Sequence, residues 1–406
     1  MTMAESRPIY IEDSDALKAF IEEASASPLL AIDTEFMREK TYYPVLCLVQ
    51  VAYYPKESLT TSMDADEKSD LKTCIIDPIH IGDVSSLGRL LKDDRSVKIF
   101  HSGYQDLEIL RHETGCVPAN IFDVQIAAAL LGQTQQAGLG SLVSSFLGVN
   151  IKKGDSFTDW ARRPLADSQI EYAAEDVIYL PELYNIMSKK LKELGRLSWL
   201  DDEFASLVEK AGHIEDPFTR FRRLKKVNQL NRRQMAAARE VAAWREISAQ
   251  NRNIPRKWIL TDEQIVESCR REPKTIDDLF LVRGIRANLS TKDARKVLEL
   301  MARAYASGPE TWPEIEYQPS SERNVDAAVD LMTAYVRMRS KQEDIAMQTI
   351  ASHNELVDVA RGHCSDSPVM RGWRRKIVGD GLNDILSGRI SLRLSDEGDL
   401  LVERNG

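Results

Sequence analysis

The first half of the chain alternates short apolar runs with segments whose apolar residues recur at helical spacing. A helix is predicted from Asp13 or Ser14, because the apolar residues that follow fall on one helical face. Five apolar runs rich in β-forming residues are candidate strands: Leu29 to Ile32, Leu46 to Ala52, Thr73 to Asp77, Val97 to Phe100, and Ile121 to Phe122. Residues 1–210 are therefore predicted to form an α/β domain, a mixed five-stranded sheet with flanking helices, interrupted by a long polar loop over residues 55–72.

From about residue 211 the pattern becomes helical throughout. Residues 211–308 are predicted to form a first all-α bundle, which opens with the basic segment Arg220 to Lys226 and a long amphipathic helix. A linker rich in proline and turn residues covers 309–319. Residues 320–406 are predicted to form a second all-α bundle of similar size, and because both open with a long amphipathic helix we interpret them as a degenerate repeat.

Composition narrows the class of protein. Hydrophobic residues make up 43% of the 406 residues and charged residues 29%, as in ordinary globular proteins. No apolar run approaches the roughly 20 residues that a membrane span needs, and the five cysteines form no close pair that would predict a zinc site or a disulfide. We therefore expect a cytoplasmic protein with no membrane partner. The net charge of −9 argues only weakly against nucleic-acid binding, because binding depends on local patches.

The residues that carry candidate chemistry are mostly acidic. Asp33 and Glu35 are predicted to end the first strand, where residues two apart point to one side of the sheet. Asp106 opens a predicted helix after a later strand, while Tyr172 and Asp176 share one face of another helix. Clustered carboxylates of this kind hold hard divalent cations, and two such cations can hydrolyse a phosphodiester.

Each of these patterns also has a structural interpretation. An Asp-x-Glu pair at a strand end is usually a solvated turn, and an aspartate in a first helical turn often interacts only with the helix dipole. A Tyr/Asp pair on a helix usually combines a buried residue with a surface residue. The order of the patterns along the chain favours the metal-dependent interpretation, since carboxylates gathered without metal repel one another.

Three stretches of the sequence resemble the exonuclease motifs of the ribonuclease D family: Ile32 to Gln50, His101 to Glu108, and Thr158 to Asp176. The segment Phe122 to Gln125 resembles the strand end that follows the second motif. Because the third motif carries Tyr172, the chain is identified as a member of the tyrosine subgroup of the four-acid exonucleases. The resemblance implies an RNase H-like fold for the first domain.

The resemblance also implies a role for each residue of the acidic set. Asp33, Glu35, Asp106 and Asp176 would ligate two Mg²⁺ or Mn²⁺ ions, and Tyr172 would hold the attacking water. Because the unperturbed pKa of tyrosine is about 10, we favour orientation of the water over its deprotonation by Tyr172.

Eight further residues are candidates for supporting or substrate-binding roles. They are His101 and Asp123 beside the metal ligands, Phe36 and Met37 at the 3′-terminal base, and Lys153, Asp159, Trp160 and Arg163 near the terminal phosphate. Structural roles are equally good interpretations for Asp123, Phe36 and Met37. Packing is the better interpretation for Trp160.

The helical tail resembles the helicase-and-RNase-D C-terminal (HRDC) domain between Val241 and Ile285, whereas the second bundle matches that domain less well. An HRDC domain implies nucleic-acid binding, in which basic residues contact phosphates without reading sequence. A solvated helix face is the alternative for any single lysine or arginine.

Together these features predict a monomeric 3′–5′ exoribonuclease. It would hydrolyse single-stranded RNA 3′ ends to 5′-mononucleotides, and the resemblance points to tRNA precursors as substrates. The alternative enzyme is a DNA 3′–5′ exonuclease of repair type, since the same site cleaves both polymers, although the chain has no polymerase region or Walker-type loop. A non-enzymatic RNA-binding scaffold would have no need of all four acids and the tyrosine.

Overall fold

The structure is a computed structural model that describes residues 7–55, 71–151, 158–314, 324–364 and 367–405. Contacts within the chain divide it into two compact units. The first comprises Met1–Glu35, Leu46–Gly212 and Ser320–Gly406, and the second Phe36–Val45 and His213–Pro319. The domain boundaries expected at residues 210, 308 and 319 stay predictions.

A mixed six-stranded sheet forms the centre of the first unit, in the order β1-β4-β3-β2-β5-β6. The strands are β1 (Ile9–Ile11), β2 (Leu29–Met37), β3 (Val45–Tyr53), β4 (Lys72–Ile76), β5 (Val97–Phe100) and β6 (Ile121–Asp123). The pairs β1–β4, β2–β5 and β5–β6 are parallel, and β3–β4 is antiparallel. The prediction of five strands was wrong by one. Strand β1 has only three residues, too few to show an alternating pattern.

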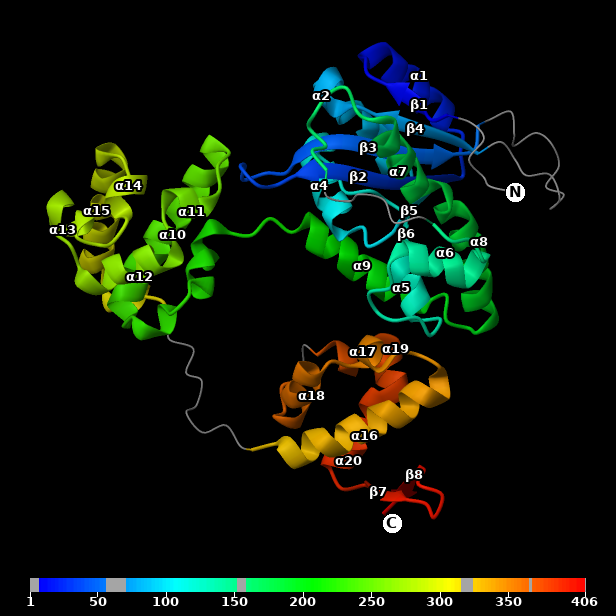
Figure 1. The fold of residues 1–406 in the computed structure, drawn as a ribbon. Helices are drawn as coiled ribbons and strands as arrows, with labels where there is room; N and C mark the ends of the chain where they lie inside the picture. The colour runs from blue at the N-terminus through cyan, green and yellow to red at the C-terminus, as the bar shows by residue number, and fades with distance from the viewer. Residues whose placement is uncertain (1–6, 56–70, 152–157, 315–323, 365–366, 406) are drawn as a thin grey trace. The chain divides into compact units, whose positions relative to one another are not determined.

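Helices cover both faces of the sheet (Figure 1). On one face, leucines of α3 (Gly88–Lys92) and α4 (Tyr104–Thr114) lie against apolar residues of β2 and β3. Helix α1 (Ser14–Ala24) reaches the same face through an edge contact between Phe20 and Tyr53, and Asp13 caps it as predicted. On the other face, α7 (Asp167–Ile178) and α8 (Leu180–Glu193) share a core with Ala31 and Ile99.

Further helices complete the two units. Those of the first unit are α2 (Pro78–Ile81), α5 (Val124–Ala129), α6 (Leu139–Leu147), α9 (Trp199–Gly212), α16 (Asp326–Glu343), α17 (Met347–Ile350), α18 (His353–Ala360), α19 (Gly372–Arg374) and α20 (Asp380–Leu386). Those of the second unit are α10 (Arg232–Arg252), α11 (Arg256–Ile259), α12 (Asp262–Arg271), α13 (Ile276–Phe280), α14 (Ile285–Asn288) and α15 (Thr291–Ala306). In the described part of the chain, no helix is long and apolar enough to cross a membrane.

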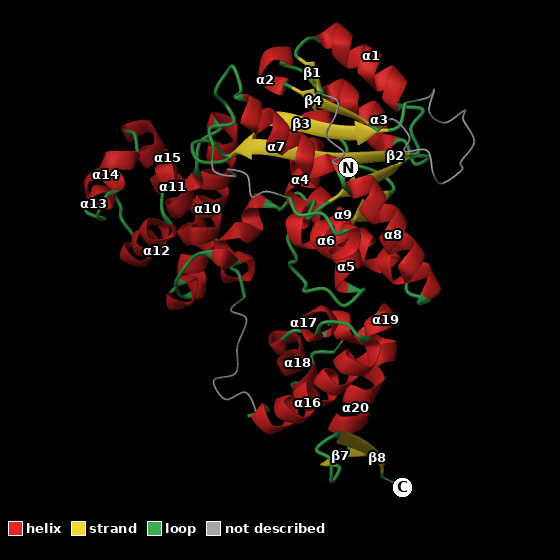
Figure 2. Ribbon diagram, turned by 45° about the vertical axis from the view of Figure 1, so that its right-hand side comes forward, coloured by secondary structure: helices red, strands yellow, loops and turns green. Residues whose placement is uncertain are grey.

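The second unit is helical apart from the segment Phe36–Val45, which follows on from β2 (Figure 2). Tyr42 attaches this segment to α10. Its hydroxyl donates a hydrogen bond to the buried carboxylate of Glu246, and its backbone N–H donates to Asn253 Oδ1 at 3.1 Å. Gln250 donates a further bond to the Tyr42 hydroxyl at 3.2 Å. These bonds fix the segment Phe36–Val45 to α10 within the second unit.

Residues 324–405 belong to the first unit because they share its hydrophobic core. Val329, Met332 and Trp373 are buried in the same cluster as Leu183 and Leu200 of the nuclease-like part. The expectation that this region is all-α is corrected at its end, where β7 (Ile390–Leu394) and β8 (Leu400–Arg404) form an antiparallel hairpin. Apolar residues do alternate with polar ones along β7, and this period of two was the missed signal.

Two stacked tryptophans connect this region to α9. The rings of Trp199 and Trp373 are stacked with centroids 4.9 Å apart, and the Trp373 indole N–H donates to Glu203 Oε1 at 2.9 Å. Arg374 forms an ion pair with the same carboxylate. Burial of Trp373, which is only 4% exposed, therefore ties the C-terminal helices to α9.

We expect Trp373→Ala to lower the free energy of unfolding by about 3–5 kcal/mol, because it removes a buried aromatic ring and leaves a cavity. Urea denaturation measures this loss. The control is Trp258→Ala, whose side chain is 48% exposed in the second unit and whose removal should cost under about 1 kcal/mol. Equal losses in the two variants would show that the C-terminal helices do not stabilise the first unit.

Candidate active site

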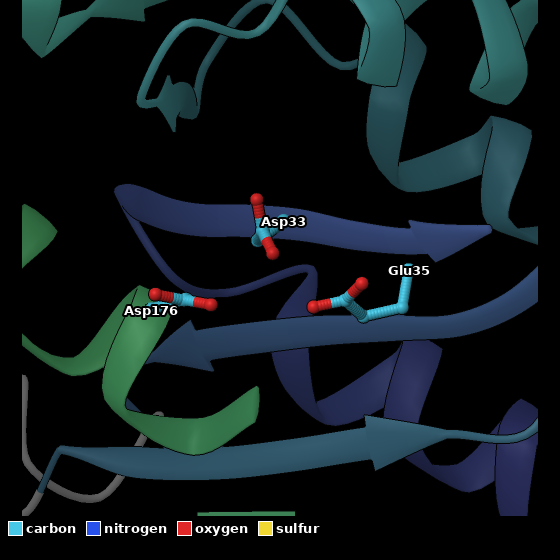
Figure 3. A group of neighbouring side chains, drawn as sticks. All are labelled: Asp33, Glu35 and Asp176. Carbon is cyan, nitrogen blue, oxygen red and sulfur yellow. The ribbon is translucent and has the colours of Figure 1, made fainter. Parts of the chain in front are cut away.

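Three acidic side chains converge above the sheet. The sequence predicted Asp33 and Glu35 at the end of the first strand. They lie within β2 instead, because the strand continues to Met37. Asp176 comes from the last turns of α7. One carboxylate oxygen from each of the three lies within 4.8 Å of the others, and Figure 3 shows the three groups facing a common space.

Asp106, the fourth predicted ligand, is not one of these three, although its charge acts on Asp33 from the first turn of α4, where it is only 7% exposed. The hydroxyl of Thr34 donates a hydrogen bond to Asp106 Oδ1. Thr34 sits between the two β2 acids, so its side chain leaves the strand on the opposite side and meets α4. Sequence reasoning missed this residue. The sequence signal for it was a hydroxyl-bearing residue between the two acids Asp33 and Glu35.

Burial and mutual repulsion make the carboxylates weaker acids than usual. Burial raises the pKa of Asp33 well above its ordinary value, and the charges of Asp106, Asp176 and Glu35 raise it further. The same causes raise the pKa of Glu35 to about 8. Burial is also the main reason that the pKa of Asp176 rises to about 7 and that of Asp106 to about 6. Without a cation, part of these acids therefore stays protonated at neutral pH, because ionising all of them would bring like charges together.

This donor set fits divalent cations. Every charged side chain that shifts the pKa of Asp33 or Glu35 is another carboxylate, so the repulsion is of the kind that a cation relieves. Hard cations such as Mg²⁺ and Mn²⁺ prefer oxygen ligands, and three are already in place. Asp33, Glu35 and Asp176 could bind an ion together, and the charge of Asp106 is felt at the same site, since it raises the pKa of Asp33.

Tyr172 lies one helical turn before Asp176 and is half-buried. Burial raises the pKa of its hydroxyl, and the charges of Asp176, Glu35 and Asp33 raise it further. A hydrogen bond from this hydroxyl in turn holds the pKa of Asp176 down. Tyr172 therefore keeps its proton at physiological pH and can donate a hydrogen bond, but it cannot serve as a general base.

Asp123 fixes the turn that leads to Asp106. Its carboxylate caps α5 and accepts hydrogen bonds from the backbone N–H groups of Ser102 at 3.3 Å and Gly103 at 2.8 Å. His101 lies beside it, and burial lowers the pKa of the imidazole, so the ring stays neutral. Among the described residues His101 Nδ1 has no hydrogen-bond partner. These contacts support a positioning role for Asp123.

Arg163 is held by the protein itself. Its guanidinium makes two hydrogen bonds to the buried carboxylate of Asp77, at 2.6 and 2.7 Å, and a third to the Cys47 carbonyl at 2.9 Å. Asp77 also accepts from the Tyr10 hydroxyl at 2.5 Å. The expected contact of Arg163 with a phosphate gains no support from this geometry. Asp77, which sequence reasoning missed, anchors the segment before α7 to the sheet.

The remaining candidates are dispersed. Trp160 is 3% exposed, and its ring lies 6.1 Å from that of Tyr172, as packing predicts. Asp159 is exposed and accepts a hydrogen bond only from its own turn, among the bonds described. Phe36 and Met37 are half-buried at the end of β2, and their place at a base stays a prediction. Lys153 lies outside the described residues.

The metal-free protein should lose stability as pH rises from about 5 to 9. The folded pKa values of about 6 to 8 exceed the ordinary values near 4, so the protonated acids stabilise the fold at low pH. This stability is lost as pH rises through the folded values, at about 1.4 kcal/mol for each unit of pKa difference.

Thermal melting in EDTA and in Mg²⁺ tests this expectation. Mg²⁺ should raise the melting temperature more at pH 8 than at pH 5, and Glu35→Gln should reduce the pH dependence. The matched control is Glu22→Gln, an exposed carboxylate on α1 that should change neither result. A metal-free protein that melts at one temperature across this range would contradict the proposed repulsion.

Comparison with known proteins supports one family throughout the chain. Residues 8–192 match the 3′-5′ exonuclease family model, and residues 234–301 match the HRDC domain model. Ribonuclease D of Sphingobium indicum is 36% identical over 394 residues, covering 95% of this chain and 96% of that protein. Ribonuclease D of Zymomonas mobilis is 34% identical over 385 residues, covering 94% of each.

Solved structures agree with this comparison. Escherichia coli RNase D, described as an exoribonuclease involved in structured RNA processing, superposes with a TM-score of 0.77 at 26% identity, covering 94% of this chain and 99% of that one. A protein from Bifidobacterium adolescentis shares the fold with a TM-score of 0.68 at 23% identity. The resemblance inferred from the motifs is confirmed: the chain is a 3′–5′ exoribonuclease that belongs to the ribonuclease D family.

Proposed function

We propose that this exoribonuclease removes nucleotides from single-stranded RNA 3′ ends with two divalent cations, Mg²⁺ or Mn²⁺, and releases 5′-mononucleotides. Dependence on a divalent metal follows from the exonuclease fold and its acidic cluster. The observation that carries the proposal is the convergence of Asp33, Glu35 and Asp176 from two separate elements. We assign these three and Asp106 as the metal ligands.

The contribution of the protein is to hold the acidic side chains in fixed positions. Cations bound at such a site would activate water for attack on phosphorus and neutralise charge on the leaving oxygen. Asp33 and Glu35 lie on β2, which is hydrogen-bonded to a strand on each side, so their side chains need little reorganisation. Asp106 is oriented by Thr34 on one side, and its turn is held by Asp123 on the other.

Tyr172 orients the attacking water in this proposal. Its raised pKa leaves the hydroxyl as a donor, and the hydrogen bond with Asp176 sets its direction. The proton of the water must therefore leave by another route than the phenol. We infer that Tyr172→Phe slows hydrolysis without abolishing it.

The physiological substrate is proposed from similarity. The E. coli relative is described as acting in structured RNA processing, and we infer by analogy that this chain trims the 3′ ends of tRNA precursors. We further propose that it acts as a monomer, since the candidate ligands come from one chain, and that it acts in the cytoplasm. The alternative, a DNA exonuclease of repair type, is separated by the substrate test below.

We expect Asp176→Asn to reduce RNA hydrolysis by at least about 10³-fold, because it removes a ligand charge while leaving helix α7 intact. The assay follows matched RNA and DNA strands, each labelled at the 5′ end so that shortened products stay visible. Glu171→Gln, an exposed carboxylate on the same helix, is the control and should retain full activity.

Wild-type rates in Asp176→Asn would remove this residue from the ligand set. Faster wild-type cleavage of the DNA strand than of the RNA strand would instead favour the repair-type alternative.

Thr34→Val should lower hydrolysis by about 10- to 100-fold, because the buried Asp106 loses a hydrogen bond that orients its carboxylate. Thr34→Ser keeps the hydroxyl and should restore most of the rate. Activity titrated against Mg²⁺ should show a higher half-saturating concentration for the valine variant alone. Equal activity in the valine and serine variants would show that the hydroxyl has no positioning role.

A further inference from the structure

The segment before α7 is held to two strands of the sheet by one side chain. Arg163 donates to the carboxylate of Asp77, which follows β4, and to the Cys47 carbonyl of β3. Its side chain is 11% exposed, and that of Asp77 is fully buried. A guanidinium can make these bonds together because its donors form a rigid planar fork. Arg163 therefore fixes where the chain enters α7 within the first unit.

The same guanidinium holds the backbone of Trp160. Its Nη1 donates to the Trp160 carbonyl at 2.7 Å and to the Arg162 carbonyl at 2.9 Å. The Trp160 side chain is buried, and among the described residues its indole N–H has no hydrogen-bond partner. The position of the indole ring therefore depends on packing and on the backbone that Arg163 holds.

The ring of Trp160 lies beside the tyrosine of the candidate active site. The ring centroids of Trp160 and Tyr172 are 6.1 Å apart, and their planes are inclined by 36°. The Tyr172 hydroxyl hydrogen-bonds to Asp176, so the direction of the phenol matters at the acidic cluster. The backbone of a helix leaves a side chain several staggered rotamers. A buried neighbouring ring restricts that choice and keeps the hydroxyl in one direction.

We propose that Arg163 and Trp160 are positioning residues of the hydrolytic reaction and act together on Tyr172. Arg163 fixes the Trp160 backbone to the sheet, and the Trp160 ring restricts the phenol of Tyr172. The inference rests on the proposed function, in which the Tyr172 hydroxyl orients the attacking water. Neither positioning residue contacts RNA, because the guanidinium is bound by protein groups and the indole is buried.

A double-mutant cycle separates this role from a general contribution to folding. The rate of single-turnover hydrolysis of 5′-labelled RNA is measured at saturating Mg²⁺ for Arg163→Lys, in the wild-type chain and in Tyr172→Phe. Lysine keeps the charge beside Asp77 but lacks the fork that reaches both strands. The rate should fall about 10-fold in the wild-type chain, because a displaced hydroxyl orients water poorly. In Tyr172→Phe, which has no hydroxyl to position, the same substitution should cost less than about 2-fold.

Trp160→Phe tests the second step of the same arrangement. It keeps the bonds of Arg163 and an aromatic side chain, but the smaller ring restricts Tyr172 less. Its loss of rate should likewise be larger with the Tyr172 hydroxyl than without it, so the proposal remains testable if Arg163→Lys does not fold. The Kd for RNA, measured in EDTA, should stay within about 2-fold of the wild type for both variants, because neither loses a phosphate contact.

Arg196→Lys is the matched control in the same unit. Arg196 is also buried and donates to two backbone carbonyls, those of Leu130 at 3.0 Å and Glu343 at 2.6 Å, and none of these residues belongs to the candidate active site. This variant should lower the melting temperature as Arg163→Lys does. Its rate should nevertheless stay within about 2-fold of the matching parent, with or without the Tyr172 hydroxyl.

Three results would overturn the proposal. Equal losses from Arg163→Lys with and without the Tyr172 hydroxyl would show that Arg163 supports the fold alone. An unchanged rate for Arg163→Lys in the wild-type chain would show that it positions nothing, and a higher Kd for RNA would indicate a phosphate contact instead. Failure of the proposed function is distinct, because it would appear as a wild-type rate in Tyr172→Phe or Asp176→Asn.

Discussion

Repulsion among four carboxyl groups gathered in one partly buried place is the constraint on which the first unit depends. Such groups would separate if their elements were free to move, and their raised pKa values express that tendency. The sheet prevents it, because β2, which carries Asp33 and Glu35, is paired with strands on both sides. The large apolar core around α7 and α8 supplies the opposing free energy.

Buried polar contacts orient the acidic residues that do not lie on the sheet. Asp106 and Asp176 lie on helices, so their directions depend on Thr34 and Tyr172. The Asp77–Arg163 pair fixes the chain before α7, and it is fully satisfied because Tyr10 and the Cys47 carbonyl also take part. A buried ion pair of this kind fixes the positions of its residues more than it adds to the free energy of unfolding. The supporting residues thus differ chemically from the proposed ligands that they hold.

The sequence pointed to the acidic cluster better than to the residues that support it, for a physical reason. Asp33, Glu35 and Asp176 fall on short-range patterns, since strand and helix periods alone decide which residues share a face. Arg163 and Thr34 depend on partners 86 and 72 residues away, which no local period reveals. The same holds for the stacked Trp199 and Trp373, which join the C-terminal helices to the nuclease core. Strand β1 was too short to predict, and the β7–β8 hairpin was missed because the whole C-terminal region was expected to be helical.

The separation of charge along the chain resolves an apparent conflict between catalysis and binding. A site that holds cations must be negative, yet a nuclease must attract a polymer that is negative at every residue. Placing basic residues in the second unit and acids in the first meets both needs without neutralising either. The overall charge of −9 is therefore a poor guide to what this chain binds.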